Sequence, residues 1–261
     1  MLLSISEKTK KELFVSLFHL IKCCTTAVNI MFKDDQMYIQ GMDKCHICLF
    51  EIKIMSDWFT TYEKKEGDQE SICVNTNMFH TVISMTTDSH SLVLEYEDDP
   101  ETINIKCIND QGKKADFDKF FNIPLCEIEE DYFSVPDIDY AVEFSMNSKK
   151  ISDIITQLNI FGDVLNISCC SEEKILFKSD GTSGNMSVEV STDDLSEFAL
   201  SEEGKTLNIC FGLNYLHKMC INTKLANDIN ISLSNDMPLK IKYDLGKDSH
   251  CVFYLAPKSE D

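Results

Sequence analysis

Short sequence matches recur along this chain at one fixed spacing, and this repeat constrains the fold more than any other feature. The spacing is 137 residues, the difference between positions 29 and 166. The matches are Val28-Asn29-Ile30 with Leu165-Asn166-Ile167, Asp43 with Asp180, Asn77 with Asn214, and Leu92 and Leu94 with Ile229 and Ile231. A fixed period of this kind indicates a repeated structural unit. A chain of 261 residues has room for two domains of about 130 residues, so we predict a duplicated domain.

The stretch from residue 120 to residue 140 separates the two copies and is typical of a surface connector. It contains Pro124 and Pro136, each of which lacks a backbone N–H group and restricts the residue before it. It also carries acidic side chains whose repulsion favours an extended path, namely Glu127, Glu129, Glu130 and Asp131. The expected organisation is an N-terminal domain at 1–120, a connector at 121–138 and a C-terminal domain at 139–261.

Four segments have apolar residues at helical spacing, two in each half of the chain. They are 6–22, 76–86, 148–160 and 213–221. In the first, Ser6 is the expected N-cap, and the apolar face consists of Leu13, Phe14, Leu17, Phe18, Leu20 and Ile21. Strands are expected at 26–32, 36–42, 46–54, 90–97, 101–108, 115–121, 141–146, 163–170, 174–180, 184–191, 206–211, 227–234, 238–243 and 250–255, with an acidic loop at 192–203. Each half is therefore a β-rich unit with two short helices, an α+β fold.

The formal net charge of −20 argues against nucleic acid at face value and favours solubility or a basic partner. All 24 basic residues are lysines. Arginine is the usual reader of guanine edges, so its absence argues against sequence-specific DNA recognition. The compositional bias of an AT-rich genome, such as a viral one, explains this absence equally well.

No stretch approaches the run of about 18 apolar residues that a membrane span needs, and the first residues do not form a signal peptide. We therefore expect a reducing compartment. In such a compartment the 12 cysteines are expected to be free thiols within cores.

The lysines are concentrated on the helical segments of an otherwise acidic chain. These segments carry Lys8, Lys10, Lys11, Lys22, Lys149, Lys150 and Lys218, and Lys224 follows the fourth segment. Lys8, Lys11 and Lys22 are expected to lie away from the apolar face of the first helix. Lysine on an outer helix face is ordinarily just solvated, but cations on corresponding elements of both halves also suit one basic surface. Both interpretations stay open at this point.

Two motifs imitate functional sites, but their surroundings do not fit. Gly204-Lys205-Thr206 resembles the end of a phosphate-binding loop, yet Ala199 replaces the first glycine, the acidic Glu202 and Glu203 repel phosphate, and a strand is expected next. Cys45-His46-Ile47-Cys48 is a single CxxC motif on an expected strand, whereas a structural zinc site needs four ligands.

The remaining titratable residues form no catalytic pattern. The acidic pairs Asp34-Asp35, Asp98-Asp99 and Asp193-Asp194 lie in expected turns, where aspartate is favoured. None of the six histidines is spaced to pair with a serine or cysteine nucleophile, and no G-x-S-x-G motif occurs. We therefore expect no enzymatic activity, no catalytic residues, no cofactor and no metal.

Three short segments carry a resemblance to a known family. They are Gly41-Met42-Asp43 with His46-Ile47, Val135-Pro136-Asp137, and Tyr254-Leu255-Ala256-Pro257-Lys258. Together with the duplicated domain, the acidic connector and the tail ending in Glu260-Asp261, they make the chain similar to the eukaryotic and viral sliding clamps, the proliferating cell nuclear antigen family. The resemblance covers the whole chain in order.

The resemblance implies the DNA clamp fold, in which each of two similar domains has β-sheets outside and two α-helices lining the inner face. It further implies that three chains form a ring around duplex DNA and act as a polymerase processivity factor in replication and repair. Twelve helices spaced at about 9–10 Å form a circle roughly 36 Å across, which helix thickness reduces to about 26 Å. A duplex roughly 20 Å wide fits that hole, whereas two chains would leave only about 15 Å.

The resemblance also implies roles for individual residues. DNA phosphates would be bound without base specificity by Lys8, Lys11, Lys22, His80, Lys149, Lys150, Lys218 and Lys224. Thr81, Ser84, Thr156 and Ile221 stand where the family has basic residues, so weak DNA affinity is expected.

In the family, partner proteins insert a short hydrophobic and aromatic motif into a pocket beneath the connector. The implied partner-binding residues are Met42, His46, Ile47, Leu49, Phe133, Val135, Pro136, Pro238, Tyr254, Leu255, Ala256 and Pro257, with ordinary core packing as the alternative for Ile47 and Leu49. The ring contact pairs strand edges of neighbouring chains. The implied interface residues, on strands 115–121 and 184–191, are Phe117, Lys119, Met186 and Val188.

The implied partners are duplex DNA, further copies of the chain, a DNA polymerase, a clamp loader and other proteins with such motifs. The implied location is the nucleus, or a viral replication compartment. One alternative is a checkpoint-type clamp subunit that assembles with different chains. Another is an acidic DNA mimic, which would expose acids rather than lysines on the helix faces. A hydrolase is the least supported alternative, because no nucleophile–base pair is evident.

Overall fold

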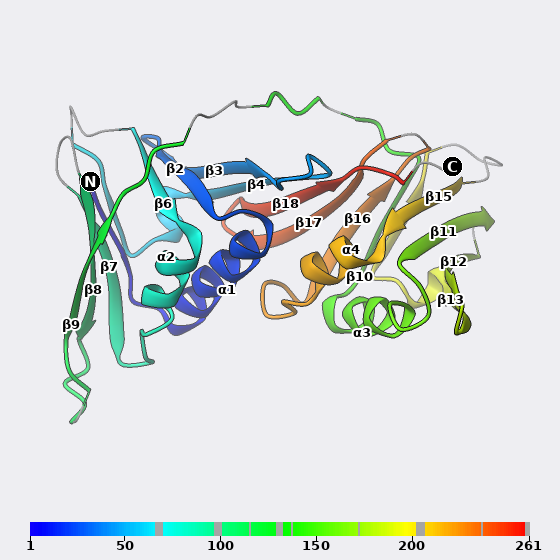
Figure 1. The fold of residues 1–261 in the computed structure, drawn as a ribbon. Coiled ribbons are helices and arrows are strands. Elements are labelled where there is room, and N and C mark those ends of the chain that lie inside the picture. Colours follow the sequence, from blue (N-terminus) through cyan, green and yellow to red (C-terminus); the bar gives the residue numbers. More distant parts are fainter. Residues whose placement is uncertain are drawn as a thin grey trace. The chain divides into compact units, whose positions relative to one another are not determined.

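A computed structural model describes residues 1–65, 70–96, 101–114, 116–128, 133–136, 138–171, 173–201, 207–235 and 237–258 (Figure 1). Among these residues, no helix combines the length and apolar character that crossing a membrane requires.

The secondary-structure elements follow one order in both halves of the chain. The first half contains β1 (Leu2–Ile5), α1 (Lys8–Cys24), β2 (Ala27–Phe32), β3 (Gln36–Met42), β4 (Cys48–Met55), the 3-10 helix η1 (Ser56–Trp58), β5 (Thr61–Glu63), β6 (Ser71–Asn75), α2 (Thr76–Ile83), β7 (His90–Glu95), β8 (Thr102–Asn109) and β9 (Lys119–Pro124). The second half contains β10 (Val142–Asn147), α3 (Ser148–Leu158), β11 (Val164–Ser171), β12 (Lys174–Gly181), β13 (Gly184–Ser191), η2 (Thr192–Asp194), β14 (Glu197–Leu200), β15 (Leu207–Gly212), α4 (Leu213–Cys220), β16 (Asp228–Leu233), β17 (Leu239–Gly246) and β18 (Ser249–Leu255). The order of strands and helices is identical in the two halves, so the predicted duplication is confirmed.

The strands pair in matching orders in the two halves. In the first half, β5-β1-β7-β8-β9 form one sheet, and β6, β2, β3 and β4 lie in that order in another. The corresponding orders in the second half are β14-β10-β16-β17-β18 and β15-β11-β12-β13. The pairs are antiparallel, with Leu3 opposite Leu94 in the first half and Phe144 opposite Ile231 in the second. The predicted α+β class is confirmed.

The chain divides into two compact units. The first unit consists of Met1–Lys44, Glu51–Phe133 and Leu245–Cys251, and the second of Cys45–Phe50, Ser134–Asp244 and Val252–Asp261. The first unit continues to Phe133 and so includes most of the predicted connector. The predicted boundaries near residues 120 and 138 stay predictions.

Each unit contains a pair of helices that lie side by side, α1 with α2 and α3 with α4 (Figure 1). The helices have 17, 8, 11 and 8 residues in chain order, so packing rather than intrinsic propensity must stabilise most of them. In the first unit the ring of Phe18 lies between those of Phe14 and Phe79, with centroid distances of 5.1 and 4.5 Å. In the second, α3 buries Ile151, Ile155 and Leu158, whereas Ile154, which the helical pattern also places inward, is half-buried.

The prediction that Ser6 caps α1 is wrong. The N-cap residue is Glu7, whose side chain makes no capping hydrogen bond. Ser6, which follows β1, instead donates its backbone N–H to Oγ1 of Thr60 at 2.9 Å. The capping residues of α2 and α3 are Asn75 and Asn147, which the sequence analysis did not identify.

The sequence analysis missed four strands, β1, β5, β6 and β14. The first two pair with each other, with Leu3 opposite Tyr62. They have four and three residues, which is too short for a periodic pattern to show. β14 lies within the segment predicted to be an acidic loop, and it pairs with β10 through Phe198 opposite Phe144.

The predicted strand at 115–121 is displaced along the chain, because β9 runs from Lys119 to Pro124. Phe117 therefore precedes the strand, and the first residues of the predicted connector belong to it. β9 is an edge strand of its sheet. Proline, which has no backbone N–H group, is tolerated on such a strand, so Pro124 is compatible with this position.

The described cysteines are free, as predicted, but only some are buried. The buried ones are Cys48, Cys73, Cys107, Cys169, Cys220 and Cys251, whereas Cys45 is exposed. Burial raises the pKa of the Cys220 thiol to about 12, which makes it unreactive at neutral pH.

Candidate functional site

The lysines at the start of α1 are engaged within their own unit. Lys8 Nζ lies 2.7 Å from Oδ2 of Asp88. This hydrogen bond raises the pKa of Lys8 and lowers that of Asp88. Lys10 Nζ donates to the backbone oxygen of Trp58 at 2.7 Å and lies 5.4 Å from the centroid of the indole ring. Both ammonium groups therefore have partners within the unit, and the Lys8–Asp88 pair is exposed to solvent.

The expectation that Lys11 lies on the outer side of α1 is wrong. The residue is only 2% exposed. Its ammonium group donates to the backbone oxygens of Thr87 at 2.9 Å and Asp88 at 3.1 Å, and to that of His90. The segment between α2 and β7 presents these three carbonyl groups toward α1, and Lys11 satisfies them. Burial lowers the pKa of Lys11.

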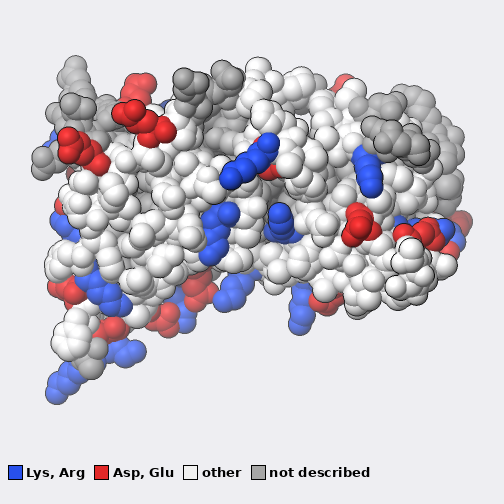
Figure 2. Space-filling model, in the orientation of Figure 1, with Lys and Arg blue, Asp and Glu red and all other residues white. Residues whose placement is uncertain are grey.

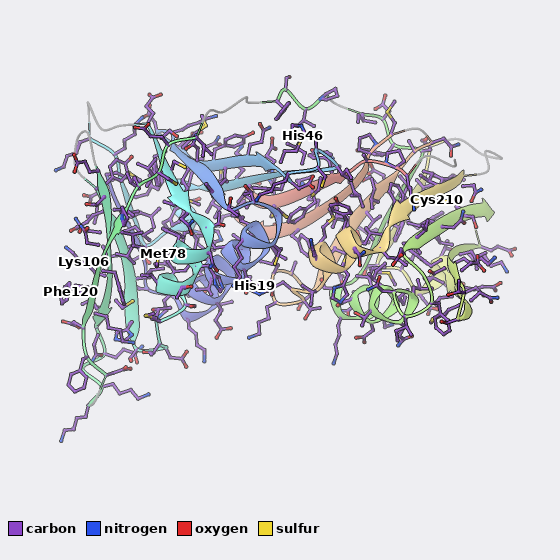
Figure 3. The ribbon with its side chains drawn as sticks, in the orientation of Figure 1. His19, His46, Met78, Lys106, Phe120 and Cys210 are labelled. Atoms are coloured by element: carbon purple, nitrogen blue, oxygen red, sulfur yellow. The ribbon has the colours of Figure 1, made fainter. Side chains whose placement is uncertain are left out.

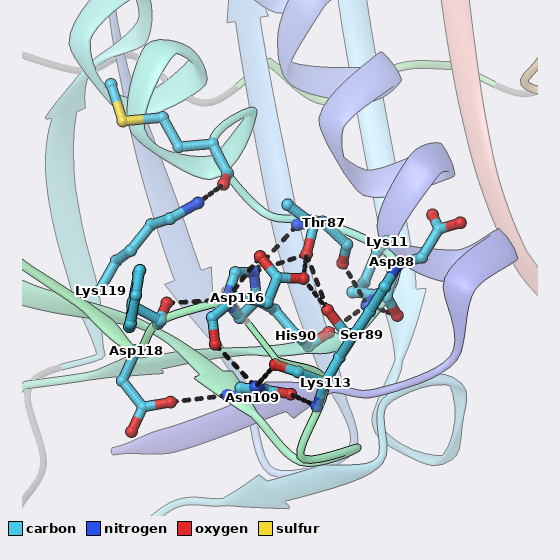
Figure 4. A network of polar contacts seen from close by, with 12 residues as sticks. Lys11, Thr87, Asp88, Ser89, His90, Asn109, Lys113, Asp116, Asp118 and Lys119 are labelled. Carbon is cyan, nitrogen blue, oxygen red and sulfur yellow. Dashed lines mark hydrogen bonds and ion pairs between the residues drawn. The ribbon is translucent and has the colours of Figure 1, made fainter.

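The Lys11 contacts belong to a polar network that holds the segment between β8 and β9 (Figure 4). The imidazole of His90 accepts from the backbone N–H of Thr87 at Nδ1, at 3.1 Å, and donates from Nε2 to the backbone oxygen of Phe117 at 3.0 Å. The carboxylate of Asp116 accepts from the hydroxyls of Ser89 and Thr87, which lowers the pKa of Asp116. The network fixes the backbone at Asp116 and Phe117, directly before β9.

Lys22, His80 and His19 form a separate cluster on α1 and α2. Lys22 Nζ lies 3.1 Å from Nδ1 of His80, and the ring centroids of His19 and His80 are 5.4 Å apart. Figure 3 shows His19 on α1. All three side chains are half-buried. The structure therefore brings together two of the predicted DNA-binding residues, Lys22 and His80, and adds a histidine that the sequence analysis did not select.

The second unit presents its predicted DNA-binding lysines differently. Lys149, Lys150, Lys218 and Lys224 are all exposed, and no described carboxylate forms an ion pair with any of them. Lys218 Nζ lies 5.8 Å from the ring centroid of Tyr215 on its own helix. On the face that Figure 2 shows, some lysines stand singly amid uncharged surface, while others along the lower edge lie beside acidic residues. The four lysines that the sequence analysis assigned to DNA in the second unit are therefore accessible to a polyanion.

Helix stability does not explain the position of Lys149 and Lys150. Both lie in the first turn of α3, where the positive end of the helix dipole disfavours a cation. The side chain of Asn147 accepts from their backbone N–H groups at 3.1 and 3.3 Å, so the helix end is capped without them. Their side chains are thus free to act outside the unit.

The predicted partner-binding residues of the second unit include a directly connected set. The backbone N–H of Ala256 donates to the oxygen of Ile47 at 3.0 Å, which ties the C-terminal segment to the residues before β4. Ile47 is 37% exposed, and it follows His46, whose φ of 57° turns the chain. Tyr254 is half-buried, but Leu255 is fully buried and belongs to the core.

Pro238 and the C-terminal segment are each held to a neighbouring element of the second unit. The backbone oxygen of Pro238 accepts from the hydroxyl of Tyr140 at 3.1 Å. The backbone N–H of Lys258, which follows Pro257, donates to the oxygen of Cys210 at 2.7 Å. Burial raises the pKa of Tyr140 to about 12, so it stays a hydrogen-bond donor throughout the neutral range.

In the first unit, Gln40 of β3 holds the connector at Phe133. Gln40 Nε2 donates to the backbone oxygen of Phe133 at 2.8 Å, and its Oε1 accepts from the Phe133 N–H at 2.8 Å. Gln40 is buried, whereas the Phe133 side chain is exposed and Met42 is half-buried. The sequence analysis missed Gln40, and its only signal was a polar residue at a buried position of a strand.

The predicted ring-contact residues lie just before β9, on β9 and on β13. Phe117 is 75% exposed, and Phe120 on β9, which the sequence analysis did not select, is 67% exposed (Figure 3). Lys119 Nζ donates to the backbone oxygen of Met85 at 2.7 Å. Met186 and Val188 are half-exposed on β13, which stands at one end of its four-stranded sheet.

Comparisons with known proteins match both halves of the chain to one family. Residues 6–132 match the family model described as proliferating cell nuclear antigen, N-terminal domain, and residues 134–258 match the model of its C-terminal domain. The chain belongs to the proliferating cell nuclear antigen family. It is therefore a DNA sliding clamp, a processivity factor for DNA polymerase.

Three curated relatives extend over most of this clamp. The proliferating cell nuclear antigen of Chaetomium thermophilum is 26% identical over 245 residues, which cover 92% of each chain. That of Caenorhabditis elegans is 28% identical over 86% of this chain and 85% of its own. Proliferating cell nuclear antigen 2 of Plasmodium falciparum is 27% identical over 96% of this chain and 97% of its own.

The rival interpretations receive no support. A DNA mimic would carry acids on its exposed helix faces, yet Lys149, Lys150 and Lys218 are exposed there. The clamp family is a non-enzymatic scaffold. Among the described residues, no group of three or more histidine, cysteine, aspartate or glutamate side chains is placed to hold a metal ion. In the CxxC motif, Cys45 precedes β4 and is exposed, and only Cys48 lies on the strand.

One surface hollow lies away from the predicted site residues, and several predicted features lie outside the described residues. A hollow of about 270 Å³ on β10, β14 and β16, lined by Ser145, Glu197, Asn230 and neighbouring residues, includes none of the predicted site residues. Outside the described residues lie Gly204-Lys205-Thr206, Asp98-Asp99, the acids Glu129, Glu130 and Asp131, Asp137, and the terminal Glu260-Asp261. The strand expected after Thr206 is present as β15.

Replacement of the buried lysine, Lys11→Met, is expected to lower the free energy of unfolding of the clamp by about 1–3 kcal/mol. Three carbonyl oxygens would lose their buried donor. Urea unfolding measures the change, and Lys149→Met, at an exposed position, is the matched control with an expected change within about 0.5 kcal/mol. Duplex binding by folded Lys11→Met protein should equal that of the wild type. A loss of DNA affinity without a loss of stability would contradict the structural role of Lys11.

Proposed function

We propose that three copies of this clamp close a ring around duplex DNA, and that lysines of the second unit supply most of its contact with DNA phosphates. The observation that supports this proposal is the contrast between the two sets of lysines. Lys149, Lys150, Lys218 and Lys224 are exposed and unpaired by any described carboxylate, whereas Lys8, Lys10 and Lys11 are engaged within the first unit. We therefore withdraw Lys11 from the proposed DNA-binding set.

Lysine suits a contact that must slide. An ammonium group on a flexible stem is a point charge that binds phosphate without fixing a register, and the chain has no arginine fork that would do so. A closed ring also needs little affinity, because topology retains it on the duplex. A small number of free lysines is compatible with both requirements.

The proposed DNA contact is tested by the charge reversal Lys149→Glu/Lys150→Glu. This variant should shorten polymerase products on circular primed templates and lower the salt dependence of duplex binding by about two phosphate contacts. The matched control, Lys53→Glu/Lys242→Glu on strands β4 and β17, makes the same change in net charge and should retain product length. Equal effects of the two variants would show that net charge, rather than the helix face, governs DNA binding.

The proposed ring contact pairs β9 of one copy with β13 of the next. Both strands stand at the end of a sheet, where unpaired backbone groups are open to another strand. β9 also carries the exposed Phe120, and β13 the half-exposed Met186 and Val188, which supply apolar area for such a contact.

The proposed contact predicts that Phe120→Asp abolishes ring formation, because a carboxylate would be buried against an apolar edge. Sedimentation at micromolar concentration should give a trimer for the wild type and a monomer for this variant. Phe133→Asp, a change at another exposed phenylalanine, should leave the trimer intact. A monomeric wild type would contradict the ring itself.

We propose that partner proteins bind the second unit at the surface formed by His46, Ile47, Leu49, Pro238, Tyr254, Ala256 and Pro257. The supporting observation is the bond from Ala256 to Ile47, which joins two of the segments and leaves the Ile47 side chain open to solvent. The occupant would be a short peptide with hydrophobic and aromatic anchors. Met42, Phe133, Val135 and Pro136 keep their predicted roles as further contacts of such peptides, while buried Leu255 supports the segment from within the core.

This partner surface predicts that Ile47→Asp weakens the binding of such a peptide, taken from a polymerase terminus, by about tenfold or more. Fluorescence anisotropy of the labelled peptide measures the affinity. Ile221→Asp, at an exposed isoleucine just after α4, is the matched control and should leave the affinity unchanged. Equal affinities of the wild type and the Ile47 variant would remove this residue from the surface.

The remaining features of the proposal follow from the clamp role. The protein would have no catalytic activity of its own and no cofactor. It would recruit a polymerase, a clamp loader and repair enzymes. It would act in the nucleus, or in a viral replication compartment if its genome is viral.

A further inference from the structure

The cluster of His19, Lys22 and His80 is an unusual group for a face that binds a polyanion. Two of its three members are imidazoles whose rings lie 5.4 Å apart with an angle of 56° between their planes. Lys22 Nζ lies 3.1 Å from Nδ1 of His80, so the three side chains form one continuous polar group across α1 and α2. All three keep part of their surface open to solvent.

In the free protein the two imidazoles are neutral at pH 7. The ammonium group of Lys22 can donate to His80 only when Nδ1 of the ring carries no hydrogen. Burial, followed by the charge of Lys22, lowers the pKa of His19, and the same causes together with His19 lower the pKa of His80. Among the described residues, no carboxylate contributes to either shift.

The other charged groups on the neighbouring elements are engaged elsewhere. The elements packed against α2 are α1, β6 and β9. On α1, Lys8 binds Asp88, Lys10 binds the Trp58 oxygen and Lys11 is buried. The charge of Glu12, also on α1, acts on Lys8. On β9, Lys119 binds the Met85 oxygen, and β6 carries no charged residue. The cluster is therefore left with one permanent charge, that of Lys22.

We propose that this cluster is a proton-coupled phosphate site, in which a backbone phosphate of duplex DNA binds Lys22 while His19 and His80 take up protons. The inference rests on the proposed contact between the helix faces and DNA. A phosphate places a negative charge beside both rings, which favours their charged forms and offsets the repulsion from Lys22. Protonation turns Nδ1 of His80 into a donor, so the Lys22 ammonium leaves it and turns to the phosphate.

Each imidazolium then donates a charge-assisted hydrogen bond, which is stronger than a neutral one. The phosphodiester stays anionic throughout this range, so only the protein titrates. The cluster carries one positive charge without DNA and up to three with DNA bound. The first unit, whose other α1 lysines are engaged, would in this way add positive charge only where a phosphate is present.

The test is the affinity of the full-length protein for a short fluorescent linear duplex at pH 8 and pH 6, at one low ionic strength. The wild type should bind about three- to tenfold more tightly at pH 6, because a pKa rise of about one unit on binding corresponds to at most tenfold for each ring. His19→Gln/His80→Gln should lose most of this ratio. His250→Gln, which changes a histidine elsewhere, should retain it. His80→Lys, with a fixed charge, should bind more tightly than the wild type at pH 8 and vary less with pH.

Calorimetry in buffers of different ionisation enthalpy provides an independent measurement, the number of protons taken up as the duplex binds. Uptake by the wild type should exceed that by the His19→Gln/His80→Gln variant. Equal wild-type affinities at the two pH values, or the same ratio and the same uptake in this variant, would overturn the inference. If Lys149→Glu/Lys150→Glu leaves duplex binding unchanged, the helix–DNA contact fails and takes this inference with it. If that variant weakens binding but the wild type shows no pH ratio, only the proton-coupled site fails.

Discussion

The packing of two short helices within each unit is the interaction on which the other features depend. Helices of 8 or 11 residues are marginal in water on their own, so α2, α3 and α4 exist because their apolar sides are buried. Phe79, Ile155 and Leu216 are each at most 2% exposed. Because this burial supplies the stability, residues on the outer sides of the helices are not needed for it. Those positions can therefore carry residues chosen for an external ligand, including the unfavourable first-turn lysines of α3.

The charge distribution follows from the same separation of roles. A protein with a net charge of −20 repels a polyanion over most of its surface, so a DNA contact must rely on local cations. In the first unit two of these cations have internal partners, Asp88 for Lys8 and the Trp58 oxygen for Lys10. In the second unit no described carboxylate forms an ion pair with the four lysines assigned to DNA. The two halves share one order of elements but differ in how many of their helix lysines have internal partners. Duplication of a fold therefore does not require duplication of its surface.

The sequence predicted the repeated architecture well, because periodicity and duplication are local or regular signals. The apolar stripe of α3 and the strand at 36–42 are where the pattern places them. The errors concern features that only tertiary contacts decide. Nothing in the local sequence shows that Lys11 meets three carbonyl groups of residues 87–90, or that Gln40 holds Phe133, since their partners are 76 or more residues away. β9 was misplaced because the alternation of Phe117 with charged neighbours imitates a strand, while the actual strand extends to Pro124.

The polar network around Lys11 connects α1 with the residues before β9. The buried ammonium group of Lys11 binds the segment that leads into β7. Hydrogen bonds of His90 and Asp116 then connect this segment to the residues before β9. Phe117 and Phe120 therefore project from a backbone that is fixed by buried polar contacts rather than from a loose loop. In the proposed ring β9 is the closing edge, so the order that this network imposes on the residues before β9 would support closure.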